Sequence, residues 1–231
     1  RQNGQAMPAN EKLVSRLFAD AGYTCGLAGK LHLATCANGV VETRIDDGYR
    51  IFHWSHHPQP DWPENAYTQW LHDKGTSWEE LYGGPSTDYI KHGVPEEYNQ
   101  TTWCAEKAIE FIRDAQSPWL LSFNNFGPHG PFDLPADWTE WFDVDSVPGP
   151  AFQESDLAMQ NEYLKGVDFS YRPIAARRPD EWNPAVLEPY QRGISRIDGH
   201  PMKILQAAYW ATIELVDRQI GRILDVLEET G

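Results

Sequence analysis

The sequence predicts an α/β fold in which a mainly parallel sheet is flanked by helices. Two stretches of the chain each show an amphipathic helical pattern followed directly by a short apolar strand pattern, and a third helical pattern covers residues 206–229. Helices that alternate with strands in this way are typical of parallel sheets. The chain has 231 residues, of which 41% are hydrophobic, so residues 1–231 can bury one sizeable core and belong to a single domain.

The first helix and strand are expected over residues 10–28. Asn10 is a suitable N-cap for the helix, and Gly22 follows the helix where a left-handed C-terminal cap belongs. The apolar stripe of this helix consists of Leu13, Leu17, Phe18 and Ala21. Residues 23–28 carry mostly small and apolar side chains and form the first predicted strand.

The second helix and strand are expected over residues 101–123. The helix starts at Thr101 or Thr102, and Ser117-Pro118 breaks it because proline has no backbone N–H to continue the ladder. Its apolar face consists of Ala105, Ala108, Ile109 and Ile112. Residues 119–123, with the sequence Trp-Leu-Leu-Ser-Phe, form the second predicted strand.

Residues 206–229 form the third predicted helix, which is strongly amphipathic. Its apolar stripe consists of Tyr209, Ile213, Val216, Ile220, Ile223 and Leu227. Gly231 is a suitable helix stop, and by the rhythm of the first two units a further strand is expected to follow. The segments 34–98 and 133–200 lack sustained periodicity, and we expect them to be long loops that form pocket walls or cover the surface.

Polar side chains follow both predicted strands at the point where each strand ends. Lys30 and His32 come directly after the first strand, and His129 follows the second. Residues two apart on an extended backbone point to the same side, so Lys30 and His32 can reach one anionic group. Open parallel sheets bind their ligands at the carboxyl ends of the strands. The sequence therefore predicts an anion site formed by Lys30, His32 and His129.

The composition narrows the choice of partners. A formal net charge of -15 argues against binding to nucleic acid or to an anionic membrane surface, so an anionic ligand must be held locally. No apolar run approaches the roughly 20 residues that span a bilayer. The three cysteines, Cys25, Cys36 and Cys104, have no paired spacing, so no disulfide framework is expected. No pattern specifies an oligomeric state.

Residues 53–57, with the sequence His-Trp-Ser-His-His, form a second candidate cluster. Imidazole groups close to the carboxylate of Asp61 are ligands that zinc or a similar ion prefers. The neighbouring prolines and tryptophans favour an aromatic loop instead. We therefore expect His56 and His57 to line a substrate pocket rather than to hold a metal.

Three elements of the sequence resemble the sulfatase family. Residues 22–34 are similar to its pattern Gly-Tyr-x-Thr-x-x-x-Gly-Lys-Trp-His-Leu-Gly, with Leu31 in place of the tryptophan and Ala34 in place of the last glycine. Residues 128–132, Pro-His-Gly-Pro-Phe, resemble its Pro-His-x-Pro-Phe element. Residues 209–224 resemble the helix that precedes its last metal-binding strand. These elements occur in family order, and the resemblance covers most of the chain.

The resemblance implies hydrolysis of a sulfate ester, of a small molecule or a glycan, in the alkaline-phosphatase-like fold. Sulfatases use a formylglycine nucleophile, made from the cysteine or serine of a Cys/Ser-x-Pro-x-Arg motif, and a calcium ion that polarises the sulfate. By this resemblance Lys30 would hold a sulfate oxygen and His32 would hydrogen-bond the formylglycine hydroxyl. His129 would contact the sulfate or protonate the leaving alkoxide.

The sequence departs from the family pattern at the nucleophile and the metal ligands. No Cys/Ser-x-Pro-x-Arg motif occurs in it, and Asp46-Asp47 is a poor metal pair because Asp47-Gly48 indicates a turn. The amino-terminal nucleophile and metal segment and the carboxyl-terminal metal segment are expected to lie before Arg1 and after Gly231. The chain is thus expected to be the central part of a sulfatase catalytic domain that itself binds no calcium.

Two alternative functions stay open on the sequence. The first is a phosphonate monoester or phosphodiester hydrolase of the same superfamily, because such relatives also use the Gly-Lys-x-His element. The second is a non-catalytic anion- or glycan-binding fragment, which the missing nucleophile and the aromatic loops suggest.

Overall fold

A computed structural model of the chain describes residues 6–8, 10–34, 36, 41–56, 62–83, 90–116, 118–130, 132–148, 155 and 200–231. The helices are α1 (Val14–Asp20), α2 (Ala66–Asp73), α3 (Trp78–Tyr82), α4 (Gln100–Asp114) and α7 (His200–Thr230). The strands are β1 (Thr24–Gly29), β2 (Ile51–Trp54), β3 (Ile90–His92), β4 (Trp119–Asn124) and β5 (Phe132–Leu134). None of the described helices is both long enough and apolar enough to cross a membrane.

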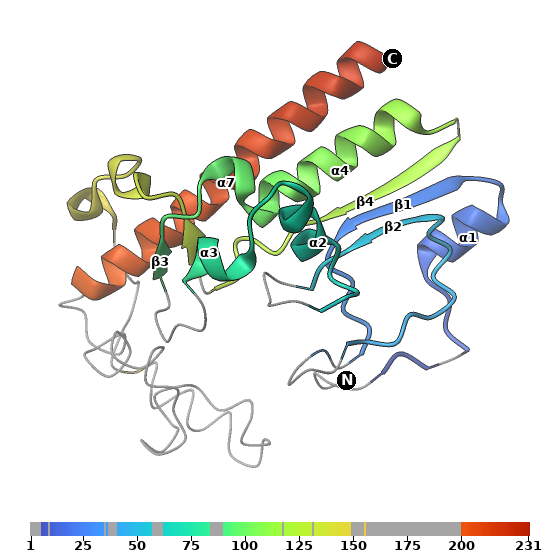
Figure 1. Ribbon diagram of the computed structural model, residues 1–231, viewed down its shortest axis with the longest axis horizontal. Helices are drawn as coiled ribbons and strands as arrows, with labels where there is room; N and C mark the ends of the chain where they lie inside the picture. Colours follow the sequence, from blue (N-terminus) through green and yellow to red (C-terminus); the bar gives the residue numbers. More distant parts are fainter. Residues whose placement is uncertain are drawn as a thin grey trace.

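The main sheet has three parallel strands in the order β2-β1-β4 (Figure 1). Gly29 at the end of β1 lies opposite Trp54 of β2 and Asn124 of β4, so all three strands end at the same edge. The two predicted strands are confirmed, with Thr24–Gly29 where 23–28 was expected and Trp119–Asn124 where 119–123 was expected. The predicted parallel sheet flanked by helices is confirmed as well.

Helices cover both faces of this sheet. On one face Ala28 of β1 packs in a buried cluster with residues of α4 and α7, which run side by side in Figure 1; the cluster includes Ala105, Ala108, Phe111, Ile223 and Val226. On the other face Cys25 and Leu27 of β1 pack with Phe18 and Ala19 of α1. Side chains of one strand therefore alternate between two helical layers, which is the pattern of a sheet that is buried on both faces.

The helix α4 begins one residue before the predicted start. The Asn99 side chain accepts a hydrogen bond from the backbone N–H of Thr101 at 2.9 Å, so Asn99, rather than a threonine, is the N-cap. This end of α4 lies close to the end of β2, because Gln100 Nε2 donates to Ser55 Oγ at 2.7 Å. The amino terminus of α4 is therefore at the same edge as the carboxyl ends of the strands.

The predicted capping and apolar stripe of α1 are partly wrong. Leu13 is the N-cap residue, and it makes no side-chain capping bond, so Asn10 does not cap this helix. Leu17 is 54% exposed and Val14 is 62% exposed, whereas Phe18 packs against the core. The helix is only seven residues long, about two turns, so few side chains define its apolar face. The predicted left-handed Gly22 is confirmed by its φ of 92°.

The predicted apolar stripe of α7 is confirmed only in part, because Ile223 is buried and Leu227 packs against the core but three of its six residues are exposed. Tyr209, Ile213 and Ile220 are 42%, 42% and 38% exposed. The buried face is formed mainly by smaller residues, among them Ala207, Ala208, Ala211, Thr212 and Leu215, with Ile223 and Val226 further along. The alanines of α7 pack in one buried cluster with Phe132 and Leu134 of β5, whereas Ile223 and Val226 pack with residues of α4 in another. Small side chains allow α7 to approach β5 closely, so the packing selects this face.

The segment 34–98 contains regular elements that periodicity does not predict. It provides β2, α2, α3 and β3, and a buried aromatic cluster forms around Tyr67, Trp70, Tyr82 and Trp103. Burial raises the pKa of the Tyr67 and Tyr82 hydroxyls, which lie 2.8 Å apart. The segment 133–200 is described only in part, up to residue 148 and at residues 155 and 200. β3 and β5 pair in parallel as a second, two-stranded sheet.

Candidate anion-binding site

Gly29 fixes the start of the segment that carries Lys30 and His32. Its φ of +112° is a conformation that side chains other than glycine's rarely adopt, and a Cβ there would lie 2.1 Å from the backbone oxygen of Asn124. Lys30 N donates to that oxygen at 2.6 Å, and Asn124 Nδ2 donates to Lys30 O at 3.0 Å. The first residues after β1 and the last residue of β4 are thus held together by two hydrogen bonds.

Lys30 and His129 meet at one aromatic ring. The Lys30 ammonium lies 5.4 Å from the centre of the Phe126 ring, and the His129 ring centre lies 4.7 Å from the same ring. Burial lowers the pKa of Lys30 below its ordinary value, and the nearby Cys36 and Glu42 oppose that shift. An ammonium that has lost part of its hydration gains by binding an anion, so this contact favours an anionic ligand.

His129 presents one ring nitrogen to a ligand. Its Nδ1 lies 2.5 Å from the backbone oxygen of Gly130, and a carbonyl oxygen can only accept a hydrogen bond. Nδ1 therefore carries the proton in the neutral ring, and Nε2 is the nitrogen left for another partner. The residue is exposed, as a group that meets a ligand from solvent should be.

His32 contacts the end of β2 rather than the end of β4. Its ring meets the ring of His56 edge to face, with centres 4.6 Å apart and planes at 81°. His32 is exposed, whereas His56 is only 7% exposed and also lies near Trp54. The buried ring of His56 therefore packs against the exposed ring of His32. That His56 contacts a substrate stays a prediction. The predicted substrate residue His57 lies outside the described residues.

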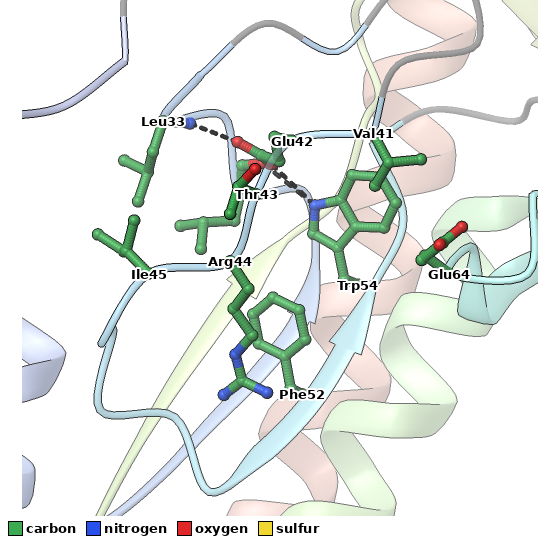
Figure 2. Close-up of a pocket in the computed structure, with 10 residues that line it drawn as sticks. Leu33, Val41, Glu42, Thr43, Arg44, Ile45, Phe52, Trp54 and Glu64 are labelled. Atoms are coloured by element: carbon green, nitrogen blue, oxygen red, sulfur yellow. Dashed lines mark hydrogen bonds between the residues drawn. The ribbon is translucent and has the colours of Figure 1, made fainter.

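The far side of the Lys30–His32 segment is anchored by Glu42 (Figure 2). One carboxylate oxygen of Glu42 accepts from the backbone N–H of Leu33 at 2.7 Å and of Ala34 at 3.2 Å, and the other accepts from Trp54 Nε1 at 2.9 Å. Trp54 Nε1 also lies 3.2 Å from the backbone oxygen of Leu31. The segment that follows β1 is therefore tied to β4 on one side and to β2 on the other.

Side chains with even and odd numbers in this segment lie on different sides of it. Lys30 and His32 contact Phe126 and His56, whereas Leu31 and Leu33 line a separate pocket with a volume of about 420 Å³ (Figure 2). The predicted alternation is consistent with this placement. The anion-binding candidates therefore form an arc along the strand ends, with His129 and Lys30 beside β4 and His32 beside β2.

The described residues do not suit a metal or a formylglycine. Among them no group of three or more His, Cys, Asp or Glu side chains is arranged to hold a metal ion. Asp47 is buried, pairs with Arg44 at 2.8 Å and accepts from Tyr49 N, and Gly48 has a φ of 81°, so Asp47-Gly48 is a turn as predicted. The cysteines at positions 25, 36 and 104 are unpaired thiols in buried positions. We therefore assign no chemical step to either group.

Sequence reasoning missed three contributors to this site. Phe126 carries no charge, Glu42 is eight and nine residues from the two backbone N–H groups that it binds, and Gln100 reaches Ser55 from a different element. The sequence held one indication that Phe126 belongs to the site, because Phe126 lies two residues after a strand end and three before His129. The sequence held no such indication for Glu42 and Gln100, because only the fold brings their partners close.

The fold and this arrangement define an α/β protein with cationic and imidazole side chains at the carboxyl ends of parallel strands. The chain belongs to the sulfatase family, which it matches over residues 2–231. It is 25% identical to an arylsulfatase of Clostridium perfringens over 232 residues, covering 96% of this chain and 44% of the relative. It is 24% identical to human iduronate 2-sulfatase, covering 95% of this chain and 38% of the relative. The chain thus spans less than half the length of these curated relatives.

Solved structures share the fold. The phosphonate monoester hydrolase of Agrobacterium radiobacter superposes with a TM-score of 0.61 at 19% identity, covering 99% of this chain and 46% of that one. A protein crystallised with its substrate D-glucosamine-2-N,6-O-disulfate superposes with a TM-score of 0.50 at 19% identity, covering 100% of this chain and 49% of that one. The predicted alkaline-phosphatase-like α/β architecture is therefore confirmed.

Proposed function

We propose that the whole protein hydrolyses sulfate esters and that Lys30, His32 and His129 contact the sulfate group. The observation that carries the proposal is the meeting of Lys30 and His129 at the Phe126 ring, with His32 beside the end of β2 at the same edge of the sheet, in a chain of the sulfatase family. The arylsulfatase and the iduronate 2-sulfatase among the relatives support a sulfate ester as the substrate. The complex with a disulfated glucosamine supports a small molecule or a glycan as its carrier.

Each of the three side chains has a distinct task in this proposal. The Lys30 ammonium pairs with a non-bridging sulfate oxygen and stabilises the charge that grows as the ester bond breaks. His129, when protonated on Nε2, gives that proton to the bridging oxygen as the sulfur–oxygen bond breaks, so that the alcohol leaves uncharged. His32 donates a hydrogen bond beside them, and its ring is held by His56. In the proposal the nucleophile and the calcium ion are not assigned to residues of this chain.

A test with the whole protein compares two lysine variants. Lys30→Ala should lower kcat/KM for 4-nitrophenyl sulfate by about 10²–10³-fold, the size found when one preorganised charge-stabilising donor is removed. Lys12→Ala is the matched control, because the Lys12 side chain is 62% exposed and forms an ion pair with Asp20 on the surface; the activity of this variant should equal that of the wild type. Equal rates for both variants would rule out the role given to Lys30.

Variants of His129 separate binding from proton transfer. His129→Ala should slow the hydrolysis of an alkyl sulfate, whose alkoxide needs a proton, more than that of 4-nitrophenyl sulfate, whose leaving group is already stable. A uniform loss on both substrates would place His129 in sulfate binding alone. No loss on either substrate would remove it from the site.

A phosphonate monoester hydrolase is the second candidate. It is suggested by the fold that the chain shares with the phosphonate monoester hydrolase of Agrobacterium radiobacter. A relative from Trinickia caryophylli, 24% identical over 84% of this chain and 34% of the relative, is named as a multifunctional alkaline phosphatase superfamily protein, so substrates other than sulfate esters deserve a test. Measuring kcat/KM of the whole protein on matched aryl sulfate, phenylphosphonate and phosphodiester esters discriminates the two. A preference for the phosphonate would replace sulfate as the substrate, and saturable sulfate binding without turnover would favour a binding fragment instead.

A further inference from the structure

The pocket behind the Lys30–His32 segment is distinct from the candidate anion site. It has a volume of about 420 Å³, and its wall includes Leu31 and Leu33, whose neighbours Lys30 and His32 contact Phe126 and His56 instead. Pockets that hold small organic molecules have volumes of about 300–1,000 Å³ and mainly apolar walls. Its size therefore suits one small ring compound.

Two polar groups in the pocket wall, Glu42 and Arg44, already have partners. Glu42 accepts hydrogen bonds from Leu33 N, Ala34 N and Trp54 Nε1. Arg44 donates to both carboxylate oxygens of Asp47 and to Tyr49 O. Apart from Thr43 and Glu64, the rest of the described wall is apolar surface, formed by Leu31, Leu33, Val41, Ile45, Phe52 and Trp54.

Charge at the pocket opposes an anionic ligand. The carboxylates of Glu42 and Glu64 both line it, and Figure 2 shows Glu64 on the same side as Trp54. The one cation of the wall, Arg44, is paired with the buried carboxylate of Asp47 and stacks on the Phe52 ring at 3.9 Å. An intact sulfate ester would meet two carboxylates there, whereas an uncharged ring would meet the Phe52 and Trp54 side chains.

We propose that this pocket binds a small uncharged aromatic molecule, such as a substituted phenol. The aromatic walls and the volume fit one ring, and the two carboxylates exclude its sulfated form. A ligand of about eight heavy atoms in such a pocket has a Kd on the order of 1 mM. The proposal concerns a site that does not depend on the catalytic activity, so its outcome is independent of whether the whole protein is a sulfatase.

The test is a titration of the whole protein, labelled at Ile, Leu and Val methyl groups, with p-cresol and with p-tolyl sulfate. Saturable NMR shifts with p-cresol should be confined to Leu31, Leu33, Val41 and Ile45, and p-tolyl sulfate should not produce them at the same concentration. Absence of shifts up to about 10 mM p-cresol, ten times the expected Kd, would overturn the proposal. Equal shifts with the sulfate ester would do the same.

Two variants that fill the pocket complete the test. Leu31→Trp introduces the residue that the sulfatase pattern has at this position, and Ile45→Trp fills the pocket from another wall. Each should lower the affinity for p-cresol at least ten-fold while its other methyl signals stay native. Ile213→Trp is the matched control, because Ile213 is 42% exposed on α7, and it should bind p-cresol like the wild type. Unchanged affinity in both filled variants would show that p-cresol binds elsewhere.

Discussion

Replacing Gly29 by alanine should destabilise the protein strongly, because two independent costs coincide at this residue. Its φ is +112°, and an added Cβ would lie 2.1 Å from the oxygen and 2.6 Å from the carbon of the Asn124 carbonyl. Both atoms are backbone of β4, so they cannot rotate away as a side chain could. Relief requires β1 and β4 to separate, which breaks the 2.6 Å hydrogen bond from Lys30 N to Asn124 O.

The expected loss in the free energy of unfolding is about 4 kcal/mol. A strained backbone conformation costs about 1–3 kcal/mol, a lost hydrogen bond about 0.5–1.5 kcal/mol, and overpacking about 1–3 kcal/mol. Gly93→Ala isolates the first of these costs. Gly93 has a similar φ of +101°, and no atom lies within 4 Å of its added Cβ. This control variant should lose only about 1–3 kcal/mol.

The assay is urea unfolding followed by circular dichroism, with thermal melting as a second measure. A further 2 kcal/mol for Gly29→Ala corresponds to a melting temperature about 4–8 °C below that of Gly93→Ala in a chain of this size. Equal losses in the two variants would refute the clash with Asn124. A Gly29→Ala protein as stable as the wild type would refute the reasoning as a whole.

Three further predictions follow from contacts of the same site. Glu42→Gln should lower the free energy of unfolding by about 1–3 kcal/mol, because an amide nitrogen must replace one acceptor oxygen. Glu64→Gln loses no hydrogen bond of the described structure and should leave the free energy of unfolding unchanged. Urea unfolding measures both variants. Phe126→Leu should weaken sulfate binding about 2–10-fold, whereas Phe126→Tyr keeps a ring beneath the ammonium and should retain it, as calorimetry can check. Burial lowers the pKa of Lys30, so sulfate binding should be complete below that lowered pKa and should be lost as the pH rises through it, at a pH below 10.5. A midpoint of the loss of sulfate binding at or above pH 10.5, in a titration followed by NMR, would contradict this.

Much of the main sheet could be predicted, because strong local signals mark its elements. Gly22 and the break at Ser117-Pro118 mark two helix-to-strand transitions, and the structure has both. β2 could not be predicted, because its four residues include a histidine and it lies at the sheet edge, where only one neighbour defines it. Its position follows from pairing with β1, which is a long-range contact.

The buried face of α7 shows a different limit. Periodicity weights large side chains, so it selected Tyr209, Ile213 and Ile220, which are exposed, together with Ile223, which is buried. Packing beside β5 instead favours Ala207, Ala208 and Ala211, each 0% exposed. Because alanine scores low on hydrophobicity but permits close contact, the choice of face depends on the neighbouring elements and cannot be derived from α7 alone.

The candidate site could be predicted in part for a related reason. Lys30, His32 and His129 follow strand ends, and the structure brings Lys30 and His129 to one aromatic ring. The contact of His32 with His56 depends on where β2 lies, so the sequence could not predict it. The placement of these residues at strand ends could therefore be predicted, whereas contacts between strands could not.

Side chains in the segment after β1 alternate between the anion site and the pocket behind it. Substitutions in related proteins can therefore affect one of the two without affecting the other. Substitutions at Leu31 and Leu33 alter the volume behind the segment and leave every charge of the anion site in place. Substitutions at Lys30 and His32 alter the charges and leave that volume unchanged. Glu42 and Asn124 fix the backbone of residues 30–33, which is twelve main-chain atoms long at three atoms per residue. The recognition of an anion and the shape of the pocket behind the Lys30–His32 segment can therefore change independently within these four residues.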